Sequence, residues 1–117
     1  MIKGERVYVY DAELVRVVDG DTLYFNLDLG LRIHHDIRVR LLDVDAPEIR
    51  GSEKPMGLQV KRLVDEFLEK WKDLPLKVET HKTGKYGRWL GVIWVGDINL
   101  NELIVAWSKE ARKMTFD

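Results

Sequence analysis

The segment from residue 23 to residue 29 alternates strictly between apolar and polar side chains. Its apolar face would carry Leu23, Phe25, Leu27 and Leu29, and its polar face Tyr24, Asn26 and Asp28. Successive side chains of a β-strand point to opposite faces, so a period of two predicts a strand with one buried face. Asp19-Gly20 before this strand and Gly30 after it are turn signals, so we expect it to be bounded at both ends.

Shorter patterns of the same kind predict further strands on both sides. They cover residues 7–10, 14–18, 37–42, 76–80 and 90–95. In the strand at 37–42, Val39 and Leu41 would face away from Arg38 and Arg40, because neighbouring residues alternate between the two faces.

Two amphipathic helices are also predicted. The first covers residues 55–72, where Val60, Leu63, Val64, Phe67, Leu68 and Trp71 recur at spacings of three and four. The second follows Asn99, which forms a capping-box pattern with Glu102. Its apolar face would carry Leu103, Ile104, Trp107 and Ala111.

The order of these elements indicates the fold class. Several strands, a helix, two strands and a helix are typical of a mostly β (α+β) domain built on a small, highly curved sheet. A five-stranded Greek-key barrel of the OB type with two helices fits this order. The 117 residues suit a single domain, residues 1–117.

Composition limits the chemistry. The chain has no cysteine, so a metal ion would have to be held by oxygen atoms or by the three histidines. Lys and Arg total 19 and Asp and Glu total 20, so a nucleic-acid partner would have to be attracted by local charge. Residues 1–6 lack the apolar segment of a secretory signal, and no apolar run is long enough to span a membrane. We therefore expect a cytoplasmic monomer with no membrane partner, a trimmed leader being the alternative.

Three polar clusters are candidates for function, and each has a structural alternative. Asp19-Gly20-Asp21-Thr22 also fits an ordinary hairpin turn. The second cluster, residues 40–48, combines Arg40 with the carboxylates of Asp43, Asp45 and Glu48, and it also fits a solvated strand end. Asp43 and Asp45 have the same strand parity and would point together. The third cluster, Lys85-Tyr86-Gly87-Arg88, also fits an exposed basic loop.

Together, in this order and at this approximate spacing, the three clusters resemble the staphylococcal nuclease (thermonuclease) family. The resemblance extends over about residues 12–108 and implies an OB barrel and a calcium-dependent nuclease that cleaves DNA or RNA. Asp21, Asp45 and the backbone carbonyl of Ala46 resemble the family's calcium ligands. Glu48 resembles the glutamate that activates the attacking water. Arg40 and Arg88 resemble the arginines that bind the scissile phosphate, and Lys85 and Tyr86 resemble residues that contact phosphate groups of the nucleotide.

General chemistry agrees with these implied roles. Hard oxygen donors favour calcium or magnesium over zinc, and a divalent cation relieves the repulsion between neighbouring carboxylates. Planar guanidinium groups match the charge that develops on the phosphate oxygens during hydrolysis.

Two positions depart from the family pattern. Ala46 stands where the family usually has threonine, and Asp43 stands where it has an apolar residue or glycine. The main rival hypothesis is a non-catalytic OB module that binds nucleic acid or protein. A structural OB domain with surface charge is a weaker alternative. Retention of Asp21, Arg40, Asp45, Glu48 and Arg88 favours the enzyme.

Overall fold

The computed structural model describes residues 7–81 and 89–115, with side chains as far as Lys113. The first half of the chain forms β1 (Tyr8–Asp19), β2 (Thr22–Asp28), β3 (His34–Leu41), the 3-10 turn η1 (Gly51–Glu53) and α1 (Lys54–Lys70). The second half forms β4 (Leu76–His81), β5 (Trp89–Val95), β6 (Ile98–Asn99) and α2 (Leu100–Thr115).

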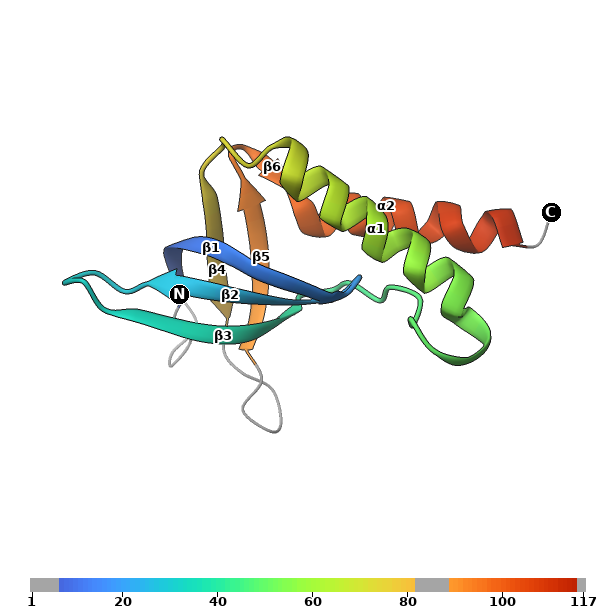
Figure 1. Ribbon diagram of the computed structural model, residues 1–117, viewed down its shortest axis with the longest axis horizontal. Helices are drawn as coiled ribbons and strands as arrows, with labels where there is room; N and C mark the ends of the chain where they lie inside the picture. Colours follow the sequence, from blue (N-terminus) through green and yellow to red (C-terminus); the bar gives the residue numbers. More distant parts are fainter. Residues whose placement is uncertain (1–6, 82–88, 116–117) are drawn as a thin grey trace.

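The sheet has the order β3-β2-β1-β4-β5-β6 and closes on itself, because β3 also pairs with β5 in parallel. The result is a closed five-stranded barrel with two helices, extended at its edge by the short β6. This confirms the OB-type fold that the order of elements predicted. Figure 1 shows α1 and α2 side by side at one end, and the β2–β3 hairpin extending from the other.

The strands predicted separately at residues 7–10 and 14–18 are a single strand, β1, of 12 residues. Its first part pairs with β4, and most of its length pairs with β2. The register shifts between Leu14 and Arg16 and again between Val17 and Asp19. Such bulges increase the local twist of a strand, so one long β1 can belong to both sides of the barrel.

The predicted alternation in β2 is confirmed at three of its four apolar positions. Leu23, Phe25 and Leu27 are buried in the barrel, together with Val39 and Leu41 of β3. Leu29 is 43% exposed, and its assignment to the buried face is wrong. The strand ends at Asp28, because the chain turns at Leu29–Ile33 to enter β3.

The helices close the end of the barrel with their apolar faces. Val60, Val64 and Leu68 of α1 are buried, as are Ile104 and Ala111 of α2. Trp71 is 37% exposed, so the predicted stripe ends before it. Phe67 of α1 and Trp107 of α2, which the sequence placed on the apolar faces of the two helices, meet edge to face with ring centroids 5.8 Å apart. This contact joins the two helices.

The expected cap of the second helix is present: the Glu102 N–H donates to Asn99 Oδ1 over 3.2 Å. Among the described residues, no helix is long and apolar enough to cross a membrane.

Candidate active site

A cavity of about 500 Å³ opens where the end of β1, the start of β2 and the end of β3 meet the loop that leads to α1. Its lining includes five of the predicted site residues, namely Asp21, Arg40, Asp45, Ala46 and Glu48. The remaining lining residues are Val18, Asp19, Pro47, Ile49 and Arg50. Three segments far apart in the sequence therefore contribute to one concave surface.

Asp21 is a largely enclosed carboxylate of this cavity, with 18% of its side chain exposed. Its own N–H donates to Asp19 Oδ1 over 3.0 Å, and its carbonyl accepts from the Leu41 N–H over 2.8 Å. Burial, together with the neighbouring Asp19, raises the pKa of Asp21 to about 6, against the lowering effects of Arg40 and Thr22. The charged form of Asp21 is therefore disfavoured in the folded protein, and a bound cation would offset this penalty.

Arg40 is fixed by backbone oxygens. Its Nη1 donates to the carbonyls of Leu41 over 3.0 Å and Val44 over 2.6 Å, while Nη2 lies 3.6 Å from Asp21 Oδ2. On the sheet, Arg40 pairs with Thr22 and so stands next to the turn that carries Asp21. About a third of the side chain, 31%, stays exposed towards the cavity. Its guanidinium is thus pre-oriented beside the carboxylate with donors left for an anion.

In the loop after β3, acidic side chains are exposed while the residues between them are buried. Asp45 and Glu48 are exposed, whereas Ala46 and Pro47 between them are buried. The Glu48 N–H donates to Glu53 Oε1 over 3.3 Å. Packing of the two central residues therefore anchors the loop and leaves its acidic side chains free to face the cavity.

Two glycines position this loop: Gly20, which lies within the first polar cluster, and Gly57, which no sequence pattern had marked. A Cβ on Gly57 of α1 would lie 2.0 Å from the carbonyl oxygen of Glu48. A Cβ on Gly20 would lie 2.7 Å from the Cβ of Ala46 and 2.9 Å from Val60 Cγ1. Gly20 is therefore required by close packing against Ala46 and Val60. A glycine within a helix pattern, as at Gly57, is the sequence signal for such a contact.

Asp43 does not join the site. It has a left-handed φ of 59°, is exposed, and is absent from the cavity lining. The strand ends at Leu41, so the parity argument that would have pointed Asp43 and Asp45 together is wrong. A left-handed conformation of this kind favours glycine.

The third cluster, Lys85, Tyr86, Gly87 and Arg88, lies outside the described residues. The structure describes the residues on both sides of it. His81 ends β4, and its Nε2 lies 2.7 Å from Glu79 Oε2. Trp89 begins β5 and pairs with Val39 of β3, while Leu90 pairs with Arg40.

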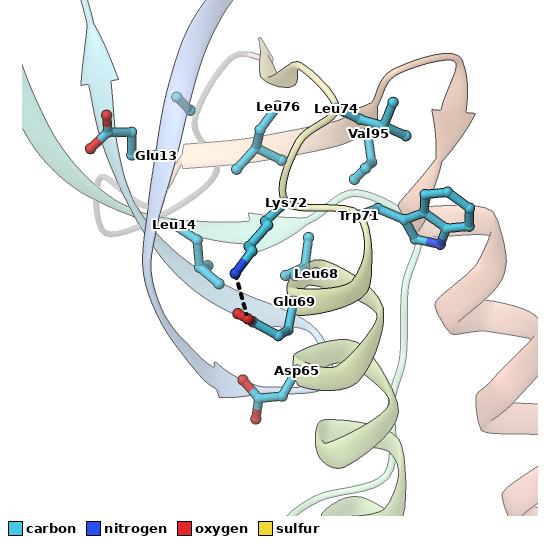
Figure 2. A pocket seen from close by; sticks show the side chains of 11 residues that line it. Glu13, Leu14, Asp65, Leu68, Glu69, Trp71, Lys72, Leu74, Leu76 and Val95 are labelled. Carbon is cyan, nitrogen blue, oxygen red and sulfur yellow. Dashed lines mark hydrogen bonds and ion pairs between the residues drawn. The ribbon is translucent and has the colours of Figure 1, made fainter.

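A second cavity, of about 400 Å³, lies between β1, the carboxyl end of α1 and the start of β4. Its lining combines apolar side chains, among them Leu14, Leu68 and Leu76, with the charged side chains of Glu69 and Lys72. Figure 2 shows Lys72 reaching towards Glu69, to which its Nζ is paired over 3.1 Å. The ammonium group of Lys72 is thus already paired with a carboxylate. None of the predicted site residues lines this cavity.

The donors of the first cavity fit a hard cation in type. Asp21 and Asp45 supply carboxylate oxygens, and Asp21 carries charge that burial disfavours. Within the described part of the chain, however, no group of three or more His, Asp or Glu side chains is close enough to enclose an ion. The remaining ligands would have to be backbone oxygens and water.

The fold and the cavity together define an OB-barrel protein whose cleft combines carboxylates with a fixed guanidinium group. The chain belongs to the staphylococcal nuclease family: residues 38–113 match the family described as "Staphylococcal nuclease homologue". The resemblance inferred from the three clusters is thereby confirmed.

Individual relatives support the same assignment. The chain is 35% identical to Protein ParB of Escherichia coli, over 71% of this chain and 41% of that protein. It is 31% identical to an uncharacterized protein of Methanocaldococcus jannaschii, over 84% and 56%. It is 33% identical to the thermonuclease of Staphylococcus intermedius, over 74% and 49%. The chain thus spans about half the length of these relatives.

Proposed function

We propose that the protein is a calcium-dependent endonuclease that hydrolyses phosphodiester bonds of DNA, RNA or both with little sequence preference. The observation that carries this proposal is the gathering of Asp21, Arg40, Asp45 and Glu48 in one cavity. Membership of a nuclease family and the name of the thermonuclease relative support it.

Each residue of the cavity has a role in this proposal. Asp21, Asp45 and the carbonyl of Ala46 would hold the cation, which when bound supplies positive charge next to the reacting phosphate. Arg40, held by two carbonyl oxygens, donates to a non-bridging oxygen of the scissile phosphate and favours the charge that develops in the transition state. Glu48 is exposed at the cavity and accepts the proton of the attacking water.

The third cluster completes the proposal. Arg88 is the second guanidinium, directly before Trp89, whose pairing with Val39 brings β5 beside the strand that carries Arg40. Lys85 and Tyr86 contact phosphate groups of the bound strand. Lys is a weaker substitute for Arg at the scissile phosphate, because it cannot make two parallel hydrogen bonds.

A non-catalytic binding module is the second candidate. It is favoured by the absence, among the described residues, of three ion-enclosing carboxylates or histidines. A cleavage assay separates the two functions. The protein is incubated with single-stranded DNA or with RNA, in calcium or in EDTA, and the nuclease proposal predicts cleavage only with calcium.

Variants assign the roles within the same assay. Glu48→Gln should lower the cleavage rate by a factor of about 10²–10³, on the scale of losing one transition-state interaction. Glu110→Gln, on the exposed face of α2, is the matched control and should cleave as the unmodified protein does. Binding without cleavage in calcium would favour the module, and a Glu48→Gln variant with full activity would remove Glu48 from the mechanism.

A further inference from the structure

The outward face of β1, β2 and β3 carries polar side chains in rows across the three strands. Figure 1 shows these strands side by side, and their register fixes the rows. The row at the cavity consists of Asp19, Thr22 and Arg40; the next consists of Arg16, Tyr24 and Arg38; the third consists of Glu13, Asn26 and Asp36. We call the second of these the Tyr24 row.

The bulge in β1 creates this row. Val15 has no partner in β2, so the register steps from Leu14 opposite Phe25 to Arg16 opposite Tyr24. If regular pairing continued after Leu14, Val15 would oppose Tyr24, and Arg16 would oppose the buried Leu23 and point into the barrel. Bulges re-aim side chains in this way, often next to active sites.

Both arginines of the Tyr24 row are available to an anion. Arg16 lies over the ring of Tyr24, with its guanidinium carbon 5.8 Å from the ring centroid, and Arg38 is the partner of Tyr24 on β3. Both arginine side chains are exposed. As far as the described residues extend, neither makes an ion pair, in contrast to Arg40, which is held beside Asp21.

The position of the row suits one nucleotide. Two residues along a strand span about 7 Å, so the Tyr24 row lies roughly that far from the row of Arg40, a distance similar to that between successive phosphates of an extended strand. The third row is acidic, and Asp36 in it accepts a hydrogen bond from Asn26 over 2.7 Å. A phosphate beyond the Tyr24 row would therefore meet like charge.

We propose that the Tyr24 row binds the nucleotide next to the scissile phosphate of single-stranded DNA or RNA. Arg16 and Arg38 bind its phosphate, and the exposed part of Tyr24 supports its sugar or base. A base within a duplex is stacked on its neighbours and cannot lie on this ring, whereas an unpaired base can. This assignment of the Tyr24 row rests on the proposed function, because it places the scissile phosphate in the cavity that Arg40 lines.

Binding measured without cleavage tests the row. A fluorescein-labelled single-stranded tetranucleotide, in DNA and RNA versions, is titrated with protein in EDTA at low salt, and its anisotropy is recorded. Tyr24→Ala and Arg38→Ala should each weaken binding about 5- to 20-fold, and Tyr24→Phe should bind as the unmodified protein does. Arg38→Ala should also lower the salt dependence by about one phosphate contact.

Arg62→Ala is the matched control, because Arg62 is an exposed arginine of α1, with 70% of its side chain accessible. It should leave the affinity unchanged. A longer blunt duplex that stays paired under the assay conditions should lose no affinity in the Tyr24→Ala variant. Thermal unfolding of each variant checks that the barrel is intact, and Arg38, whose side chain is exposed, provides a second test if Tyr24→Ala does not fold.

The proposal is overturned if both variants bind the single strand as Arg62→Ala does, or if they lose duplex binding to the same extent. Its failure is distinguishable from failure of the nuclease proposal. No cleavage in calcium together with variant-sensitive binding in EDTA would reject the enzyme and keep the row. With cleavage present, Arg38→Ala should raise KM more than it lowers kcat.

Discussion

At the scale of single residues, Asp21 shows a conflict between stability and binding. Its carboxyl is enclosed beside Asp19, and burial raises its pKa to about 6 from 3.8. The folded state therefore binds a proton more tightly than the unfolded state does. It follows that the contribution of Asp21 to the stability of the metal-free protein is present at low pH and is lost as the pH rises from about 4 through 6.

Replacement of this carboxyl should stabilise the metal-free protein. In EDTA at pH 8, Asp21→Asn should raise the free energy of unfolding by about 1–3 kcal/mol, because the amide does not carry the disfavoured charge. The difference should shrink as the pH is lowered towards 4.5, where the native carboxyl is protonated. Urea unfolding at the two pH values measures it. A variant that is less stable than the unmodified protein at pH 8 would contradict this interpretation of Asp21.

At the scale of elements, the loop that carries Glu48 and the helix that follows it form one unit. Gly57 of α1 lies directly against the backbone of Glu48 and Ile49, with no room for a side chain. The position of a candidate catalytic carboxylate therefore depends on a residue nine positions later that does not line the cavity.

Gly57→Ala should test this dependence. Alanine favours a helix by about 1 kcal/mol over glycine, but the added Cβ would displace the loop backbone, at a cost of about 1–3 kcal/mol. We expect a net loss of stability and a lower cleavage rate. Leu58→Ala, at a neighbouring position of α1 that is 44% exposed, is the control and should change stability by no more than about 0.5 kcal/mol. Full activity of Gly57→Ala would show that the loop adapts.

The β2–β3 hairpin has an unusual tip. Leu31 and Arg32 have left-handed φ angles of 54° and 64°, and Leu31 is 93% exposed. Together with Gly30, whose φ is 84°, they make three successive residues with positive φ, and the Ile33 N–H donates to the Gly30 carbonyl across them. Positions of this kind favour Asn and Gly.

The double substitution Leu31→Asn and Arg32→Gly should raise the thermal midpoint. The relieved backbone strain is about 1–2 kcal/mol, or roughly 4–8 °C per kcal/mol for a domain of this size. Differential scanning calorimetry measures the change. Since the tip is remote from the cavity, cleavage should be unaffected, and an unchanged or lower midpoint would show that the native tip is not strained.

The elements themselves were largely predictable from the sequence. The alternation of Leu23, Phe25 and Leu27, the spacing of Val60 and Val64, and the capping by Asn99 are local patterns, and local patterns determine strands and helices. The continuity of β1 and its bulge at Val15 were not predictable, because they depend on which strands β1 joins. Gathering of the site was expected only through the family resemblance, since no local pattern places Asp21 beside Arg40.

At the scale of the whole molecule, one buried side chain joins the parts that surround the site. Asn101 of α2 donates to the carbonyls of Leu42, over 3.1 Å, and Gly91, over 2.9 Å, and accepts from the Ile93 N–H over 3.0 Å. The capping pattern in the sequence involves only its neighbour Asn99. An asparagine within a helix gives no local indication of distant backbone partners.

Asn101→Ala should therefore destabilise the whole fold. Loss of these hydrogen bonds in a buried position should lower the free energy of unfolding by about 2–4 kcal/mol. Chemical denaturation monitored by tryptophan fluorescence measures it, with Asn99→Ala as the comparison, which should cost about 1 kcal/mol as the loss of a helix cap. Equal, small losses in both variants would show that Asn101 does not join the sheet to α2.

The parallel pairing of β3 with β5 has a consequence for biosynthesis. Val39 meets Trp89 and Leu41 meets Gly91, so the barrel closes between segments that are synthesised far apart in time. A nascent chain cannot complete this closure before β5 has left the ribosome, and until then the strand that carries Arg40 has an open edge. A site that depends on the position of Arg40 is therefore completed only after β5 has been synthesised.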